Sequence, residues 1–148
     1  MRVAVLTVSD RASRGEYIDE AGPVVAGYFD EVVATDVVPD EQDRIEDRLR
    51  SWIGAVDLIV TTGGTGLGPR DVTPEATRAV IEREAPGLAE AMRAAGMAKT
   101  PNAALSRQAC GIAGRTLIVN VPGSPKAAAE CIEAIIEILP HAVEMMNP

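Results

Sequence analysis

Two aspartates and one glycine-rich turn are the residues of this sequence best suited to chemistry. The turn, Gly-Gly-Thr-Gly at residues 63–66, directly follows an apolar run, and Asp71 lies just beyond it. Because glycine has no Cβ, the backbone N–H groups of such a turn can converge on one oxygen anion. The pattern favours binding of a phosphate group, and a tight strand-to-loop turn without a ligand is the alternative. It matches neither a P-loop nor the GxGxxG of a dinucleotide site.

Asp40 is the second aspartate, and it also follows an apolar run. A bare carboxylate about 6 Å from a phosphate charge costs on the order of 3 kcal/mol at an effective dielectric of about 20. A bound Mg²⁺ between the two groups turns this repulsion into a net attraction, because the ion takes oxygen ligands from carboxylates and phosphates together. The alternatives are that Asp40 caps the helix that follows it and that Asp71 is a solvated loop residue.

Basic side chains accompany these groups, although the chain as a whole is acidic. Its formal net charge of -8 disfavours nucleic acid and anionic membranes as partners. A phosphate site in such a protein needs a local supply of positive charge. Five basic residues in or beside the predicted loops could provide it: Arg11, Arg14, Arg70, Arg107 and Lys126.

The elements that must position these residues can be predicted from the apolar pattern. Hydrophobic residues make up 47% of the chain and aromatic residues only 3%, which is typical of buried parallel strands covered by helices. Continuous or β-branched runs predict strands at residues 2–8, 31–38, 58–62 and 116–121, with residues 110–113 paired to the last of these across Gly114.

Helices are predicted between the strands. They are expected at residues 20–29, from Glu41 with Asp40 at or near the start, after Thr73 as N-cap, at residues 87–95, and from Pro125 with Ser124 as N-cap. Pro140 should kink or divide the last helix. Residues 99–107 should form a loop with at most a short helix.

This alternation predicts an α/β protein, a three-layer α/β/α sandwich with a mostly parallel central sheet in a single domain of residues 1–148. Ligands of such sheets bind beyond the carboxyl ends of the strands. The loops that start at Ser9, Pro39, Gly63 and Pro122 should lie there together. This edge of the sheet is therefore the expected site.

The remaining reactive residue types give no competing site. Cys110 and Cys131 lie in no CxxC or Cys/His cluster, so both should be small buried residues rather than disulfide or zinc ligands. His141 has no Ser or Cys nearby that it could activate, which favours a structural role. The sequence contains neither a signal peptide nor a long apolar span, so a cytoplasmic protein is expected.

Five motifs in a fixed order carry a family resemblance over nearly the whole chain. The longest joins residues 61–66 to the segment Arg-Asp-Val-Thr-Pro-Glu-Ala-Thr at residues 70–77. The others are Ser-Asp-Arg-Ala-Ser at residues 9–13, Pro-Asp-Glu-Gln at 39–42, Leu-Ser-Arg at 105–107 and Pro-Gly-Ser-Pro-Lys at 122–126. Together they resemble the molybdopterin adenylyltransferases of the Mog/MoaB type, which are relatives of the N-terminal domain of gephyrin.

The resemblance implies a MoaB/Mog-like fold and a reaction in which the terminal phosphate of molybdopterin attacks the α-phosphorus of ATP. Pyrophosphate leaves, and the roles of catalyst and Mg²⁺ ligand fall to Asp40 and Asp71. Such a transfer needs mainly alignment and charge neutralisation, so it requires no His or Cys. The implied nucleotide-binding residues are Ser9, Asp10, Gly63, Gly64, Thr65, Gly66, Arg70 and Thr73, and the implied molybdopterin-binding residues are Ser106, Arg107, Ser124 and Lys126.

The family further implies a homotrimer and a downstream molybdenum-insertion protein as partner. Two other functions stay open on the sequence. The chain could be a molybdopterin-binding or carrier protein of the same fold without catalysis, or a regulatory or scaffold domain that acts through an oligomer interface. A carrier should bind the pterin without Mg²⁺-dependent affinity for ATP, whereas an enzyme should show both.

Overall fold

The strands of the computed structural model, which describes all 148 residues, form one six-stranded sheet in the order β2-β1-β3-β6-β5-β4. Its parallel part consists of β1 (Val3–Val8), β2 (Val32–Val38), β3 (Leu58–Thr62) and β6 (Thr116–Val121). The edge is antiparallel and consists of β5 (Cys110–Ala113) and β4 (Arg83–Glu84). The predicted parallel strands and the hairpin across Gly114 are confirmed. Strand β4 has only two residues, both charged and exposed, and no pattern in the sequence predicts it.

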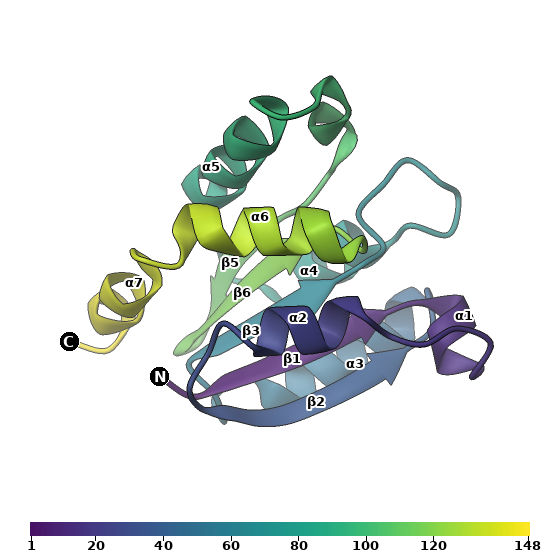
Figure 1. Cartoon of the computed structure of the whole chain (residues 1–148). Coiled ribbons are helices and arrows are strands. Elements are labelled where there is room, and N and C mark those ends of the chain that lie inside the picture. Colours follow the sequence, from purple (N-terminus) through teal and green to yellow (C-terminus); the bar gives the residue numbers. More distant parts are fainter.

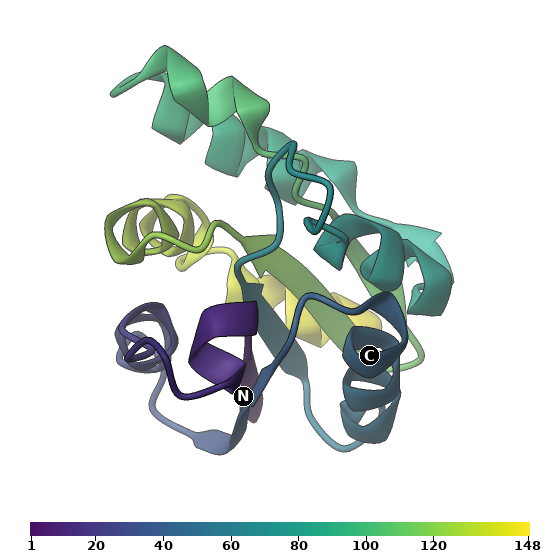
Figure 2. The same ribbon diagram turned by 90° about the vertical axis from the view of Figure 1, so that its right-hand side faces the viewer.

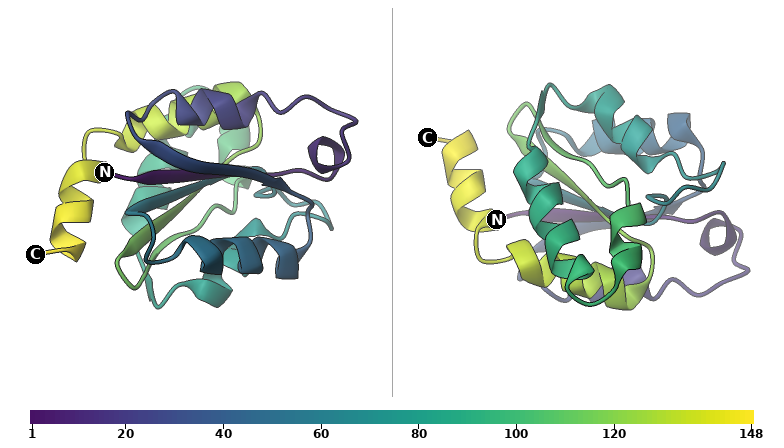
Figure 3. Two further views of the ribbon diagram at one scale, coloured as in Figure 1. Left: turned by 90° about the horizontal axis from the view of Figure 1, so that it is seen from below. Right: turned by 90° about the horizontal axis from the view of Figure 1, so that it is seen from above.

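Helices cover both faces of the sheet (Figure 1). They are α1 (Asp10–Ser13), α2 (Ala21–Ala26), α3 (Gln42–Trp52), α4 (Thr73–Val80), α5 (Pro86–Met97), the 3₁₀ helix η1 (Pro101–Leu105), α6 (Pro125–Ile135) and α7 (Leu139–Met146). Figure 2 looks toward the carboxyl ends of the parallel strands. The left view of Figure 3 shows the sheet between α2 and α6 on one side and α3 on the other. The predicted three-layer α/β/α sandwich is confirmed. None of the helices combines the length and apolar character that a membrane crossing requires.

Strand β1 shows how the two core layers arise from one run of sequence. Side chains of a strand alternate between the two faces of a sheet. Val3 and Val5 accordingly pack in the cluster that includes Val25 of α2, while Leu6 packs in the opposite cluster with Ile45 of α3. All six residues of β1 are buried, as expected of a parallel strand covered by helices on both faces.

The ends of the helices follow from local contacts. Ser124 accepts a hydrogen bond from the N–H of Ala127 (3.1 Å), which confirms it as the N-cap of α6. The predicted division at Pro140 is also confirmed, because α6 ends at Ile135 and Pro140 lies in the first turn of α7. Helix α2 is shorter than predicted, because the chain tightens into i→i−3 hydrogen bonds after Gly27.

Thr73 is not the N-cap of α4, contrary to the prediction. It is the first residue of that helix, and Val72 occupies the cap position. The Thr73 hydroxyl instead donates to the carbonyl oxygen of Gly63 (2.9 Å), across the glycine-rich turn. The hydroxyl is therefore used to hold the turn against α4 rather than to cap the helix.

Candidate functional site

Two cavities meet at the carboxyl ends of the parallel strands. The larger cavity, of about 470 Å³, lies among the glycine-rich turn, α5, η1 and the start of α6. The smaller cavity, of about 240 Å³, lies between the loop after β1 and the loops after β2 and β3. Three residues line both cavities: Gly64, Asp71 and Gly123. A group bound at the turn can therefore contact ligands in both cavities.

The glycine-rich turn has a shape that only glycine allows. Gly63 and Gly64 have φ angles of 101° and 70°, in the left-handed region. A Cβ on Gly63 would lie 2.2 Å from the carbonyl oxygen of Val8, and one on Gly64 would lie 2.2 Å from Oγ1 of Thr73. The missing side chains let the strand ends after β1 and β3 and the start of α4 come into contact, with backbone groups facing the cavities.

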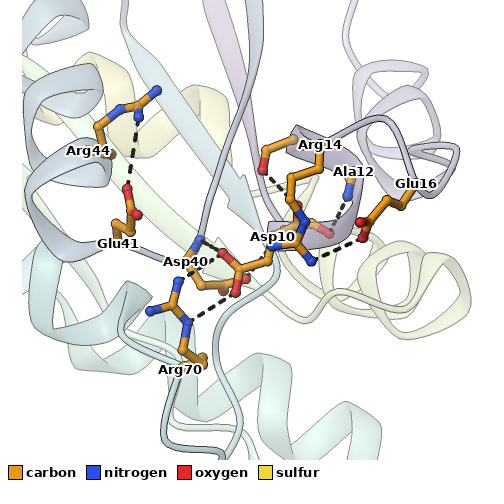
Figure 4. A network of polar contacts seen from close by, with 10 residues as sticks. Asp10, Ala12, Arg14, Glu16, Asp40, Glu41, Arg44 and Arg70 are labelled. Carbon is orange, nitrogen blue, oxygen red and sulfur yellow. Dashed lines mark hydrogen bonds and ion pairs between the residues drawn. The ribbon is translucent and has the colours of Figure 1, made fainter.

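Asp40 belongs to a network that joins three loops (Figure 4). The N–H of Asp10 donates to the Asp40 carboxylate and the N–H of Asp40 donates to the Asp10 carboxylate, both at 2.9 Å. Arg70 donates to the two Asp10 oxygens from Nε and a terminal nitrogen, at 3.1 and 3.0 Å. The Asp40 side chain therefore does not cap α3, whose N-cap position is held by Glu41. Through Arg70 and Asp10, the network connects the loop after β3 to α1.

The two acids of this network have opposite electrostatic surroundings. The Arg70 guanidinium beside Asp10 holds the pKa of the Asp10 carboxyl below its usual range. Burial raises the pKa of Asp40, and the negative charges of Asp10 and Asp71 act in the same direction. Asp40 is thus an acid without a cation of its own.

Asp71 and Asp40 line the same smaller cavity. The Asp71 carboxylate accepts a hydrogen bond from the N–H of Gly68 (2.9 Å), which folds the loop back on itself. Besides these two, the smaller cavity is lined by Asp19 and Glu20 and by no Lys or Arg. No cluster of three or more His, Cys, Asp or Glu side chains has the spacing to hold a metal ion. Two carboxylates fit Mg²⁺, which is usually held by one or two carboxylates together with phosphate oxygens and water.

Arg107 is a clamp on the loop after β3, not a free cation. Its guanidinium donates to the carbonyl oxygens of Gly66 (2.8 Å) and Asp71 (2.7 Å) and pairs with the carboxylate of Glu75 (2.7 Å). Its own N–H donates to the carbonyl oxygen of Thr65 (2.7 Å). The pairing holds the pKa of Glu75 below its usual value. These donors are already used and Arg107 lines neither cavity, so the structure does not bring it to the predicted site; the implied contact between Arg107 and molybdopterin stays a prediction.

Replacement of Arg107 by Lys should lower the free energy of unfolding by about 2 kcal/mol, because one ammonium group cannot reach acceptors that a planar guanidinium spans. Urea unfolding measures this loss. The matched control is Arg78→Lys, also paired with a glutamate, Glu84, but at 3.6 Å and with both side chains at least half exposed. It should change stability by less than about 0.5 kcal/mol. Equal effects of the two substitutions would contradict the clamp.

Two of the other basic residues predicted near the phosphate, Arg11 and Arg14, are also engaged elsewhere. Arg11 stacks over the ring of Tyr17, with 5.2 Å to the centroid, and Arg14 pairs with Glu16 at 3.0 Å. Neither lines a cavity, nor does Lys126, which is exposed. The five basic residues predicted to supply local positive charge therefore do not line the two cavities, and four of them, all but Lys126, have acidic or aromatic partners within the protein.

The remaining predicted site residues divide between the cavities and the surrounding scaffold. Ser9 lines the smaller cavity, and its hydroxyl accepts from the N–H of Ala12 (3.1 Å) as the N-cap of α1. Ser106 lines the larger cavity beside Thr65, with 3.3 Å between the hydroxyl oxygens. Residues that line a cavity are Ser9, Asp40, Gly63, Gly64, Thr65, Gly66, Asp71 and Ser106; those that line neither are Asp10, Arg70, Thr73, Arg107, Ser124 and Lys126.

Sequence reasoning missed four polar residues that line the cavities. Arg93 of α5, Glu130 of α6 and Gln108, which lies just before β5, line the larger cavity, and Asp19, which lies just before α2, lines the smaller one. No motif marks Arg93 and Glu130, because a cavity-facing polar residue of an amphipathic helix looks like a solvent-facing one, and Gln108 and Asp19 are single polar residues outside the recognised motifs.

Burial disfavours the thiolate of both cysteines, and the single histidine lies outside both cavities. Both cysteines are free and buried, as predicted, and burial raises the pKa of Cys110 to about 12. Cys131 reaches the wall of the larger cavity, and burial raises its pKa as well. His141 is exposed on α7 beside Glu144 and lines neither cavity.

Comparison with known proteins connects this geometry to one family. Residues 4–141 match the sequence model of a family described as a probable molybdopterin binding domain. A molybdopterin adenylyltransferase of Helicobacter pylori is 40% identical over 154 residues, which cover 99% of this chain and 88% of the relative. The molybdenum cofactor synthesis protein cinnamon of Drosophila melanogaster is 47% identical over 150 residues, which cover 97% of this chain but 25% of that longer protein.

The fold agrees with these matches. The crystal structure of the molybdopterin biosynthesis enzyme MoaB from Thermus thermophilus superposes with a TM-score of 0.93 at 52% identity, covering 98% of this chain and 95% of that one. The predicted MoaB/Mog-like fold is therefore confirmed.

Proposed function

The chain belongs to the family of probable molybdopterin-binding domains, and from that premise we propose that it is a molybdopterin adenylyltransferase. The reaction transfers AMP from ATP to molybdopterin during molybdenum cofactor biosynthesis. The observation that carries this proposal is the junction of two cavities at one glycine-rich turn, with Gly64, Asp71 and Gly123 common to both. The relative from Helicobacter pylori, similar over almost its whole length, supports the same activity.

Two adjoining cavities suit a reaction that joins two substrates at a phosphate. A terminal phosphate oxygen of molybdopterin forms a bond to the α-phosphorus of ATP, the bond from that phosphorus to the bridging oxygen breaks, and pyrophosphate leaves with both electrons. Holding both reactants in line removes much of the entropic barrier. The N–H of Gly63 is donated to the carbonyl oxygen of Val121 (3.1 Å). The backbone N–H groups of Gly64, Thr65 and Gly66 would therefore be the ones that bind the charged oxygens at the junction.

The proposed metal is Mg²⁺ held by Asp40 and Asp71. When bound, it would neutralise part of the triphosphate charge that the protein leaves uncompensated. The acidic lining of the smaller cavity supports this proposal, since no Lys or Arg lines it. The raised pKa of Asp40 shows that its surroundings disfavour the bare carboxylate, and a nearby cation would remove that penalty.

The remaining roles follow from the positions of the residues. Ser9, Gly63 and Gly64 would contact the nucleotide from the smaller cavity, and Ser106 would contact molybdopterin from the larger one. Arg70 is 60% exposed and paired only with Asp10, so it could turn to a bound triphosphate. A cytoplasmic location, a homotrimer and transfer of the product to a molybdenum-insertion protein complete the proposal, and they rest on the family resemblance.

The direct test supplies ATP and molybdopterin to the purified protein and measures release of pyrophosphate with Mg²⁺ and with EDTA. Release should require both substrates and the metal. Calorimetry with each substrate alone separates an enzyme from a carrier. Binding of molybdopterin without Mg²⁺-dependent binding of ATP would identify a carrier and would refute the proposed activity.

A further inference from the structure

Gln108 is a buried polar residue on the wall of the larger cavity. Only 2% of the residue is exposed. Its Nε2 donates to the carbonyl oxygen of Asn120 (3.1 Å) and lies 3.5 Å from the sulfur of Met92. Because a carbonyl oxygen can only accept, the amide nitrogen must face it and Oε1 must face away. The orientation of the side-chain amide is thus fixed by chemistry.

The Oε1 atom of Gln108 has no partner within the protein. Every hydrogen bond of this side chain is donated from Nε2. The single polar side-chain atom that is both fully inaccessible and unpartnered is Nε of Arg48, far from this wall. Oε1 therefore keeps accessible surface, and the cavity that Gln108 lines is where it is exposed. Buried polar groups in proteins are rarely left unpaired, so this acceptor points to a ligand donor.

A buried network holds the Gln108 acceptor in place. The Asn120 Nδ2 donates to the hydroxyls of Thr61 (2.8 Å) and Thr77 (2.9 Å), and its Oδ1 accepts from the N–H of Ala109 (3.1 Å). All of these side chains are buried. A ligand would meet an acceptor that needs no reorganisation, which is the condition for a selective hydrogen bond.

The rest of the cavity wall combines apolar surface with a second acceptor, which suits a heterocycle that carries N–H donors. Met92, Leu105 and Pro122 give the wall apolar surface, and α5 packs against both η1 and α6 around it (Figure 3, right). Glu130 adds a second acceptor, with its carboxylate 3.6 Å from Nζ of Lys99 and only 16% exposed.

Arg93 is the basic residue of this wall, and one of its terminal nitrogens is already bound to the carbonyl oxygens of Ser106 (3.1 Å) and Gln108 (3.2 Å). This nitrogen of Arg93 is therefore already used within the protein.

The aminopyrimidinone edge of a pterin carries a ring N–H and an exocyclic amine, which need acceptors. We propose that Gln108, through Oε1, accepts a hydrogen bond from this edge and so selects the pterin substrate in the larger cavity. The inference rests on the proposed function and deepens it by assigning the pterin to one cavity and its recognition to one residue. A site built to bind a donor rejects analogues that lack it far more strongly than an apolar pocket can.

The test is Gln108→Met, which keeps the side-chain volume and removes the acceptor. The KM for molybdopterin should rise about 10- to 100-fold, while kcat and the KM for Mg·ATP change less than about threefold, because the lost contact is made equally in the ground and transition states. The matched control is Gln42→Met on exposed α3, which loses only a contact with Glu46 and should leave every constant unchanged.

Glu130→Gln is the second variant, and it decides the case if Gln108→Met does not fold. It should raise the KM for molybdopterin at constant kcat, whereas an unchanged value would contradict the assignment of the pterin to the larger cavity and so overturn the inference that rests on it. A rise in the KM for Mg·ATP alone, in either variant, would place the nucleotide in the larger cavity; this overturns the inference and leaves the proposed function standing. If the wild-type protein has no activity, the proposed function fails, and titration of molybdopterin against both proteins still shows whether Gln108 is needed for binding.

Discussion

Replacement of Asp71 by Asn is expected to reduce pyrophosphate release by about 10²- to 10⁴-fold, the range typical of removing one charged group that stabilises a transition state. Asp71 lines both cavities, so its charge acts at the point where the two substrates meet. The amide oxygen of Asn can still accept the hydrogen bond from the N–H of Gly68, now 2.9 Å from the carboxylate. The loop should therefore keep its shape while the metal loses a ligand charge.

Steady-state release of pyrophosphate at several Mg²⁺ concentrations measures this loss, and circular dichroism checks the fold. Asp30→Asn is the control, because Asp30 is exposed and lies outside both cavities. Its activity should equal that of the wild type. Full activity in Asp71→Asn would remove Asp71 from the mechanism and with it the proposed metal site.

Gly63→Ala should destabilise the fold by about 3 kcal/mol, the sum expected of backbone strain and a buried clash. The φ angle of 101° disfavours any residue with a Cβ. The added methyl carbon would also lie 2.2 Å from a main-chain oxygen of Val8, which cannot rotate away as a side chain could. Loss of the turn geometry should lower activity even where the protein remains folded.

Thermal or urea unfolding gives the stability of this variant. The contrasting control is Gly87→Ala in the first turn of α5, where an added Cβ would meet nothing within 4 Å and the φ angle is ordinary. Alanine there should leave stability unchanged or raise it by up to about 1 kcal/mol. If Gly63→Ala were as stable as the wild type, the turn would not need glycine.

The fold could be read from the sequence because its signals are local. The short β-branched run at residues 58–62, followed by glycines, favours a buried strand, and a proline after a serine marks the start of α6. The positions of the loops follow from the parallel strands, because the carboxyl ends of parallel strands lie at one edge of the sheet. Residues 40 and 71 reach the same cavity for that reason alone.

Site residues could be predicted only where they directly follow a strand, because the end of the strand then fixes where they lie. Arg107 was expected to bind a phosphate because its charge is visible in the sequence, but its partners, Gly66, Asp71 and Glu75, are set by how two loops pack. The prediction of Thr73 as the N-cap of α4 was wrong for a similar reason, since its hydroxyl donates to the carbonyl oxygen of Gly63 instead. Gln108 gave no signal because a free acceptor is defined by the partners it lacks.

Asn120, at the centre of the buried network, joins helix α4 to the central sheet. Thr77 belongs to α4 behind the sheet, Thr61 lies within the sheet, and Gln108 faces the helices in front of it. The Gln108 amide is held by the main-chain carbonyl oxygen of Asn120, and the next residue, Ala109, is held by the Asn120 side chain. A substitution of Asn120 would therefore reach the cavity wall through the backbone on either side of that wall, although Asn120 itself does not line the cavity.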